Sequence, residues 1–383
     1  MHKHYPHHPL GNFIRAVDER NRSGAVSRLL GVSVNKSFIP SVANTIGTDM
    51  TNYKVVRKGQ FACNLIHVGR DEVIPISLYD KEEDALLSSA YDVFEIIDES
   101  VLLPEYLRLC AMRPEFDRYA MFQAVYGIRG NLPWEDFCAI EIPVPTLAEQ
   151  ECIVSQFATI EERMRQCRER IALLERTATA LYRKTFVEGI DRSNLPDGWR
   201  MGTLGEVGRV VTGKTPSSHH PEDFGDEMMF VTPSAFQKQR YITETERYLS
   251  SEGIVRLRRK IIPAGTLVVT CIGTVGKVGI IAEDSITNQQ INSLVPRASS
   301  ATSYLYHYLS DVGVTLEGQA LGGSVMPMLS KSYFEKIQIP LPPQALLEGF
   351  ARNMVLLNRS VLNNQRQLAC LEKLKAALLT QIK

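Results

Sequence analysis

Residues 137–145 read FCAIEIPVP, and residues 334–342 read FEKIQIPLP, 197 positions further along the chain. In each copy one phenylalanine, two isoleucines and two prolines hold the same relative places, and a long segment without proline follows. A pattern that returns at a fixed separation marks an internal repeat, and both copies are expected to fold alike. The chain therefore reads as two halves, each a globular segment that leads through this motif into a long helix.

Both proline-free segments place apolar residues at the alternating three- and four-residue spacing of a coiled coil. The spacing is unbroken from residue 153 to residue 181, and the second segment repeats its register. The seam positions are Phe157, Ile160, Met164, Cys167, Ile171, Leu174 and Leu181 in the first segment, and Met354, Leu357, Val361, Asn364, Leu368, Leu371 and Leu378 in the second. Heptads of this kind pack helix against helix, so we expect two coiled-coil helices, each about 45–54 Å long at ~1.5 Å per residue. A buried asparagine such as Asn364 typically fixes the register of such a pair.

The segments before the helices are rich in β-branched residues and turn signals. Candidate strands lie at 53–56, 60–62, 90–97, 228–231, 266–272, 278–281 and 293–295. Their irregular spacing favours mixed, curved sheets, so the expected class is α+β. We predict a first globular domain at 1–145, a first helix at 146–190, a second globular domain at 191–342 and a second helix at 343–383. The stretch EGIDRSNLPDGW at 188–199 is the expected linker between the halves.

The globular segments also share short motifs. LGNFI at 10–14 resembles LGEVG at 204–208, and VRKGQF at 56–61 resembles IPAGTL at 262–267. These matches extend the repeat from the helices into the domains, and they predict a pseudo-two-fold architecture.

Composition excludes several classes of protein. No apolar run reaches the ~18 residues that a membrane span needs, and the 43 basic and 43 acidic residues cancel. A neutral chain still allows a local basic face. The seven cysteines form no C-x-x-C pair and no zinc spacing with histidine, which suggests reduced thiols in a cytoplasmic protein and no metal site.

Two stretches raise the alternative of an enzyme. GRVVTGKT at 208–215 matches the phosphate-binding loop of nucleotide hydrolases, and NLPW at 131–134 resembles the catalytic motif of adenine methyltransferases. The first is followed at once by Pro216 and by a run that cannot form a stable helix, whereas a phosphate loop opens a helix. The second lacks one proline and has no glycine-rich turn upstream for a methyl donor. Both enzyme readings are therefore expected to be wrong.

Longer stretches resemble the specificity (S) subunits of type I restriction-modification systems. LPDGWRMGTLGEVGRVVTGKTPS (195–217) and MMFVTPSAF (228–236) look like the start of a target-recognition domain. YKVVRKGQFACNLIHVGRDEVIPIS (53–77) with SSAYDVFEI (88–96) looks like a second one. IEIPVPTLAEQECIVSQF (140–157) and IQIPLP (337–342) look like the family's entries to its conserved helices.

The resemblance implies a non-catalytic reader of double-stranded DNA. Two target-recognition domains would each read one half of a split, asymmetric site, and the two helices would pack antiparallel between them. Two methylation (M) subunits would dock on this frame, and restriction (R) subunits would join the full complex. S-adenosylmethionine, ATP and Mg would then be bound by these partners, and this chain would hold no cofactor.

Candidate DNA contacts follow from side-chain chemistry at loop positions. Arg, Lys, Asn and Gln can pair with base edges, and Ser, Thr and Lys bind phosphates. The candidates are Asn35, Lys36, Asn64, His67, Arg70 and Arg129 in the first domain, and Lys214, Thr215, Ser234, Lys238, Thr274, Lys277, Asn288, Gln289 and Gln290 in the second. The basic run at 256–260 is either a solvated turn or a further phosphate contact.

Overall fold

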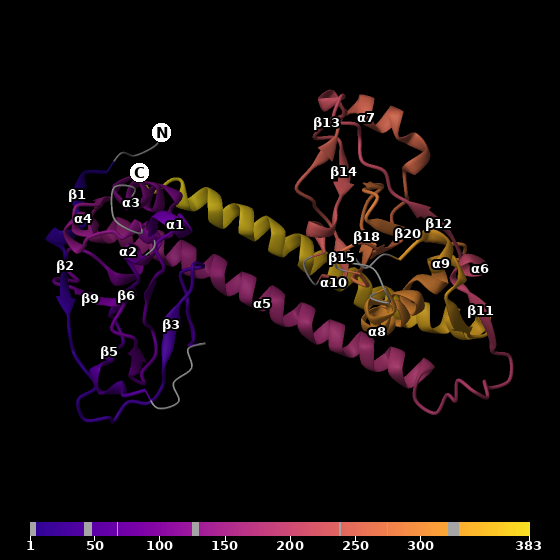
Figure 1. Ribbon diagram of the computed structural model, residues 1–383, viewed down its shortest axis with the longest axis horizontal. Coiled ribbons are helices and arrows are strands. Elements are labelled where there is room, and N and C mark those ends of the chain that lie inside the picture. Colours follow the sequence, from indigo (N-terminus) through magenta and orange to yellow (C-terminus); the bar gives the residue numbers. More distant parts are fainter. Residues whose placement is uncertain are drawn as a thin grey trace. The chain divides into compact units, whose positions relative to one another are not determined.

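The computed structural model describes residues 5–41, 48–66, 68–124, 130–236, 239–273, 275–320 and 329–383, with side chains throughout except at 314–320 (Figure 1). The chain forms two compact units. The first comprises Met1–Arg163 and Leu371–Lys383, and the second comprises Met164–Cys370. Each unit therefore contains a part of both long helices, α5 (Leu147–Phe186) and α10 (Gln344–Leu379), drawn in magenta and yellow in Figure 1.

The first unit is built on a small antiparallel sheet in the order β2 (Ile14–Val17), β9 (Asp92–Ile96), β6 (Phe61–Cys63), β7 (Ile76–Leu78). Three further antiparallel pairs are β1 (His7–Pro9) with β10 (Glu141–Pro143), β3 (Leu30–Val32) with β4 (Phe38–Pro40), and β5 (Lys54–Val56) with β8 (Ala85–Leu87). The helices are α1 (Val68–Asp71), α2 (Pro104–Ala111), α3 (Pro114–Ala124) and α4 (Trp134–Cys138), and the short 3-10 turns are η1 (Leu10–Asn12) and η2 (Met50–Asn52).

Aromatic residues fill the core of this unit. The rings of Phe61 and Phe94 stack with centroids 5.0 Å apart on neighbouring strands, and Phe137 packs against Phe94 at 5.6 Å. Phe157 of α5 and Ile382, just after α10, join the same buried cluster. The phenylalanine that opens the repeated motif thus links the sheet to the helices.

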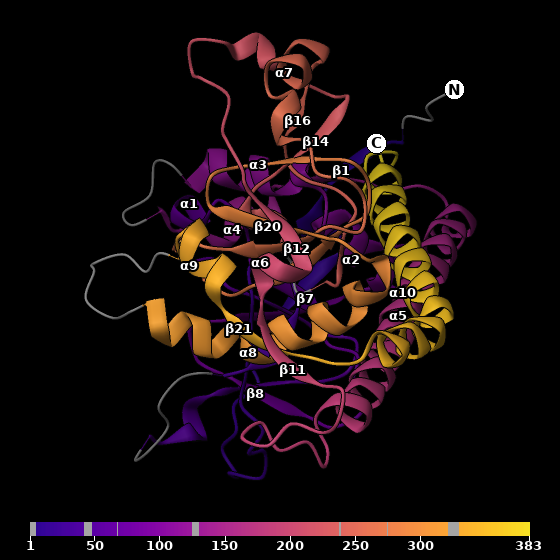
Figure 2. The same cartoon turned by 90° about the vertical axis from the view of Figure 1, so that its right-hand side faces the viewer.

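The second unit combines two mixed sheets. The first has the order β12 (Gly208–Thr212), β20 (Ile291–Pro296), β17 (Leu267–Thr270), β18 (Val278–Ile281), β15 (Tyr241–Ile242), and its last pair is parallel. The second has the order β13 (Phe224–Gly225), β16 (Tyr248–Leu249), β14 (Met228–Val231), β19 (Ile286–Thr287), and its last pair is also parallel. Figure 2 looks onto this unit.

The remaining elements of the second unit frame these sheets. β11 (Arg200–Thr203) pairs with β21 (Gln338–Leu341), as β1 pairs with β10 in the first unit. The helices are α6 (Leu204–Val207), α7 (Ser251–Arg256), α8 (Thr302–Ala320) and α9 (Lys331–Lys336), and the 3-10 turns are η4 (Pro221–Asp223), η5 (Pro233–Ala235), η6 (Arg258–Lys260) and η7 (Ser299–Ala301). The predicted α+β class is confirmed.

The repeat extends to the register of the strands. In the first unit Phe94 of β9 lies opposite both Ala16 and Phe61, and in the second unit Leu294 of β20 lies opposite both Val210 and Leu267. The order β2-β9-β6-β7 therefore corresponds to β12-β20-β17-β18. This register aligns LGNFI at 10–14 with LGEVG at 204–208, as the sequence repeat does.

The long helices extend over 40 and 36 residues. The seam residues that the structure buries are Phe157, Ile160, Met164, Cys167, Met354, Val361 and Leu368, and those that it half-buries are Ile171, Leu174, Leu181, Leu357, Asn364, Leu371 and Leu378. Within the second unit, the ring of Phe186 at the end of α5 packs 4.9 Å from the ring of Phe350 near the start of α10, so the two helices are antiparallel there. Among the described helices, none is both long and apolar enough to cross a bilayer.

Candidate nucleic-acid interface

Four loops of the second unit meet at one end of its sheets. The Lys214 amide donates to the Thr287 carbonyl at 2.9 Å, which joins the loop after β12 to the loop after β19. The Asn288 amide donates to Val231 at 3.0 Å, and the Cys271 amide donates to Gln290 at 2.8 Å. These two bonds join the loops after β14 and β17 to the loop after β19. We call residues 213–217, 232–236, 271–273, 275–277 and 288–290 the loop edge.

Gly213 is required for this convergence. A Cβ atom at this position would lie 2.1 Å from the carbonyl oxygens of both Thr287 and Asn288, so only glycine lets the two backbones pass. The hydroxyl of Thr215 then donates to the Gln289 side chain across the same junction. The glycine of GRVVTGKT thus serves backbone packing.

The same stretch lacks the setting of a phosphate-binding loop. Gly208–Thr212 is the strand β12, and residues 213–217, all described, form no helix. A phosphate loop needs a helix N-terminus at this point, because the amides of the first turn bind the phosphates. NLPW at 131–134 is similarly structural, since Leu132 is buried and Trp134 begins α4.

The loop edge exposes a mixed set of polar side chains. Lys214, Lys277, Gln289 and Ser234 are exposed, whereas Thr215 and Gln290 are half-buried. Asn288 is buried, and both ends of its amide bind Gln290, at 3.0 Å and 2.9 Å. Asn288 therefore stabilises the loop. The four exposed side chains reach solvent, although Gln289 accepts a hydrogen bond from the Thr215 hydroxyl and the Ser234 hydroxyl shares one with that of Thr232, at 2.9 Å. Lys238 and Thr274 lie outside the described residues.

The basic run at 256–260 divides into two parts. Arg256 pairs with Glu222 at 3.4 Å and with Asp223 at 3.0 Å. Lys260 turns the other way, and its ammonium donates to the carbonyl of Thr212 at 2.9 Å. This bond places η6 beside the loop edge, with Arg258 and Arg259 exposed.

The first-domain candidates are more dispersed. Asn35 is exposed in the turn between β3 and β4, and the Asn64 side chain accepts the Ile66 amide at 3.0 Å just after β6. The Arg70 guanidinium binds its neighbour Asp71 at 2.7 Å, and this hydrogen bond raises the pKa of Arg70. His67 and Arg129 lie outside the described residues.

Lys36 is turned into the first unit. Its backbone has φ of 56°, and its ammonium contacts Asp117 at 2.8 Å and the carbonyl of Ala111. Burial lowers the pKa of Lys36, and the charge of Asp117 partly offsets this effect. The ammonium is thereby occupied inside the protein.

Strand register identifies first-domain residues that loop composition missed. Because LGNFI aligns with LGEVG, the counterparts of Lys214 and Thr215 are Arg20 and Asn21. Arg20 donates to the carbonyl of Asn52 at 2.9 Å and pairs with Asp18 at 2.5 Å. The 194-residue separation of these two motifs in the sequence could have identified both counterparts.

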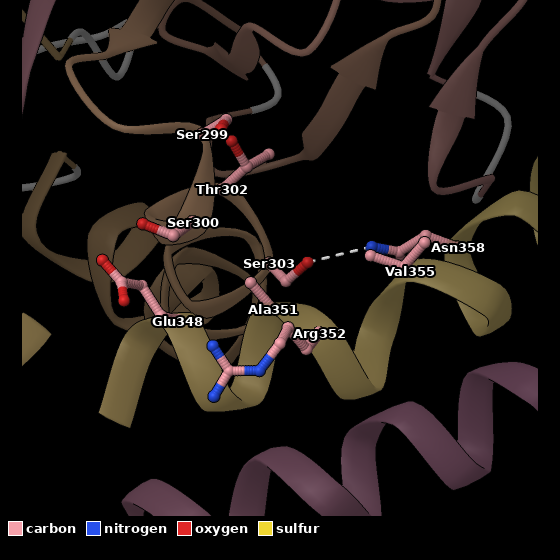
Figure 3. A pocket seen from close by; sticks show the side chains of 9 residues that line it. All are labelled: Ser299, Ser300, Thr302, Ser303, Glu348, Ala351, Arg352, Val355 and Asn358. Carbon is pink, nitrogen blue, oxygen red and sulfur yellow. Dashed lines mark hydrogen bonds between the residues drawn. The ribbon is translucent and has the colours of Figure 1, made fainter. Parts of the chain in front are cut away.

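A surface cavity of about 460 Å³ lies between the start of α8 and α10 in the second unit. Its walls are the hydroxyl residues Ser299, Ser300, Thr302 and Ser303 on one side and Glu348, Ala351, Arg352, Val355 and Asn358 on the other (Figure 3).

Among the described residues, no three His, Cys, Asp or Glu side chains gather as metal ligands.

Comparison with known proteins places these features in a family. Residues 196–346 match the type I restriction modification DNA specificity domain. The chain is 34% identical over 190 residues to the type I restriction enzyme HindI specificity subunit of Haemophilus influenzae, covering 49% of this chain and 41% of that one. It is 26% identical over 206 residues to the MjaIX specificity subunit of Methanocaldococcus jannaschii, covering 51% and 46%. The chain thus spans less than half the length of these relatives.

The fold has a counterpart among solved structures. The type I restriction-modification S subunit from M. genitalium superimposes with a TM-score of 0.64 at 14% identity, over 99% of this chain and 96% of that one. Residues 196–346, which include the loop edge, thus carry a type I restriction modification DNA specificity domain. Over about half of its length the chain is similar to type I restriction specificity subunits, and it spans less than half of theirs.

Proposed function

We propose that the chain is the DNA-recognition subunit of a type I restriction-modification complex and carries no catalytic step itself. The loop edge carries this proposal, because it presents Lys214, Lys277, Gln289 and Ser234 on a backbone scaffold held by hydrogen bonds. Lysines and hydroxyls bind DNA phosphates, and a glutamine amide pairs with a base edge. A rigid platform of this kind can read a short sequence.

The first unit would read the other half of a split site. Its four-stranded sheet shares strand order and register with the first four strands of β12-β20-β17-β18-β15, so the equivalent loops lie at the same place in the fold. The side chains differ. Half-buried Arg20 stands in place of Lys214, and Asn21, which is buried with both ends of its amide bonded to Val26, stands in place of Thr215. Different side chains on equivalent loops support an asymmetric, bipartite DNA sequence.

We assign the chemistry to partner subunits in the cytoplasm. Two M subunits would dock on the helical frame and methylate adenine with S-adenosylmethionine, and R subunits would contribute ATP- and Mg-dependent cleavage. Calorimetric titration of the full chain with ATP and with S-adenosylmethionine is expected to show no binding. Tight binding of either would favour the enzyme alternative instead.

Methylome sequencing tests the recognition role. Cells that carry this gene with its M partner should methylate one bipartite sequence, and deletion of the gene should abolish that methylation. Methylation that persists unchanged without the gene would refute the proposal.

Two substitutions at the loop edge separate phosphate contacts from base contacts. Lys214→Ala should weaken binding to all duplexes alike and reduce the slope of log K against log salt by about 0.9, because one phosphate contact is lost. Gln289→Ala should relax the preference for one base pair, by about 1–3 kcal/mol of discrimination. Lys331→Ala on α9, another exposed lysine of the same unit, is the matched control and should change neither quantity.

A further inference from the structure

The repeat gives Glu161 of α5 and Asn358 of α10 equivalent positions, 197 residues apart. Each of these side chains accepts a hydrogen bond from an arginine of its own unit. Arg108 donates to Glu161 at 2.9 Å, and Arg240 donates to Asn358 at 2.6 Å. One helix position therefore receives a guanidinium in both halves of the molecule.

Of the two arginines, Arg240 has the more deeply buried side chain. Its side chain is 1% exposed, and its guanidinium also contacts Glu175 of α5 at 2.5 Å and the ring nitrogen of His307 at 3.4 Å. The same guanidinium lies over the ring of Tyr306, 4.8 Å from the centroid. A buried charge is tolerated only when it is paired in this way. Arg240 thus joins α5, α8 and α10.

Arg240 also begins the edge of the five-stranded sheet. Its carbonyl accepts the Ile280 amide at 2.8 Å, which holds β15 to β18. On the other side of β15 the Tyr241 amide donates to the buried side chain of Gln365 in α10, at 3.3 Å. The free edge of the sheet is therefore covered by the helix, and the loop 232–236 precedes this attachment.

In the first unit Arg108 of α2 performs the equivalent contact. Glu161 also accepts a hydrogen bond from Lys375 of α10, at 2.8 Å, so α2, α5 and α10 meet at one carboxylate. Burial acts to raise the pKa of Glu161, but the hydrogen bonds from Arg108 and Lys375 outweigh it and lower the pKa.

The two units contact this helix position, Glu161 in α5 and Asn358 in α10, with arginines from different elements. Tyr106 and Tyr304 are counterparts, since each donates its hydroxyl to the first proline of the repeated motif. Two residues later stand Arg108 in the first unit and Tyr306 in the second. Where α8 carries a tyrosine, Arg240 comes from the sheet edge and stacks on it. The contact with the helix is preserved although the residue that makes it has moved.

We propose that Arg108 and Arg240 are positioning residues that attach each recognition domain to the helices, and that they restrict the spacing between the two half-sites that the protein accepts. The inference rests on the proposed DNA recognition. These arginines do not belong to the loop edge, so they should not alter which bases are read.

Amide hydrogen exchange of the full chain tests the attachment without DNA. In Arg240→Met the amides of Tyr241 and Ile280 should exchange at least about tenfold faster, because loss of ~1.4 kcal/mol of local stability gives tenfold more opening. Exchange in the first unit should not change. Arg359→Met, an exposed arginine next to Asn358, is the matched control. Unchanged exchange at β15 would overturn the attachment.

Selection of bound duplexes by the complex with the M subunit tests the spacing. Arg240→Met and Arg108→Met should each lower the preference for the native spacer over spacers one base pair longer or shorter by about fivefold or more, while each half-site sequence is retained. An unaltered spacer preference in folded variants would overturn the inference, as would a changed half-site. If Arg240→Met fails to fold, Asn358→Ala carries the same expectation. No sequence preference in the wild type would instead refute the proposed function, and the exchange result would still stand.

Discussion

At the scale of single residues, backbone approach and burial explain positions whose sequence suggests chemistry. Gly213 stands where a nucleotide hydrolase has its loop glycine, yet its role is to let β12 and the loop after β19 pass at close range. His307 could serve as a base, but it is buried against Arg240 and Tyr182. Gly213 is needed for the close approach of two backbones, and the ring of His307 is enclosed among buried side chains of the second unit.

Gly213→Ala should lower the free energy of unfolding by about 2–3 kcal/mol, because its Cβ would overlap two carbonyl oxygens. Urea unfolding of the full chain measures this loss. Gly349→Ala is the control of opposite sign. That glycine lies inside α10, and a Cβ there would make only an ordinary contact, 3.8 Å from a guanidinium nitrogen of Arg352, so alanine should stabilise the helix by up to about 1 kcal/mol.

Acid should destabilise the second unit through His307. Burial, with the charge of Arg240, lowers the pKa of His307 to about 3. The unfolded chain therefore binds a proton below its ordinary value near 6.5, whereas the folded protein does so only below about 3. His307 therefore leaves the free energy of unfolding unchanged above pH 6.5. As the pH drops toward 3 it lowers this free energy, by about 2 kcal/mol at pH 5. In His307→Gln this contribution to the pH dependence of urea unfolding should disappear; an identical slope would contradict it.

At the scale of elements, the heptads predicted the helices, but two neighbouring polar residues of α10, one in the seam and one beside it, behave differently. Asn364 is half-buried; its amide nitrogen donates to the Ser360 carbonyl at 2.8 Å, but its side-chain oxygen finds no hydrogen-bond partner among the described residues. Gln365, which no heptad position marks, is 1% exposed; its oxygen accepts the amide of Tyr241, and its nitrogen is buried without a partner in the described part of the chain. The seam of α10 thus also serves as the docking face for β15.

Asn364→Leu should therefore raise the free energy of unfolding by about 1 kcal/mol, because an unpaired polar atom is replaced by an apolar group. Gln365→Leu should lower it by about 1–3 kcal/mol, because the Tyr241 amide loses its acceptor while it stays buried. Thermal and urea unfolding of the two variants measure both changes in the free energy of unfolding. Changes of the same sign would contradict this account of the neighbouring side chains.

At the scale of the whole molecule, both long helices contribute to both compact units. If the helices set the distance between two reading edges, then removal of one heptad from each shortens that distance by about 10 Å, at ~1.5 Å per residue. With ~34 Å for each turn of about ten base pairs, the spacer should shorten by about three base pairs.

Methylome sequencing of the double deletion measures the spacer directly. Both half-site sequences should remain, because neither loop edge is touched. An unchanged spacer would show that the helices do not set it. Deletion in α5 alone should break the shared seam and abolish methylation, since the heptads would no longer face one another.

Much of this architecture was predictable because repetition is written in the sequence itself. The motif at 137–145 and 334–342, the heptads and the α+β class require only local pattern. The loop residues were harder to choose. Composition selected Lys36, whose ammonium is buried against Asp117, and it passed over Arg20, which the strand register identifies as the counterpart of Lys214. Side-chain type cannot show which way a loop residue points.

The sequence by itself determined the two-fold repeat, the long helices and the similarity to type I specificity subunits, because periodic apolar residues and recurrent motifs act through neighbours along the chain. Only the tertiary structure decided which loops converge, why Gly213 must be glycine, and that Arg240 ties the sheet edge to α5 and α10. Those contacts join residues that are 65 to 118 positions apart, and burial of a charge depends on partners that no local pattern contains.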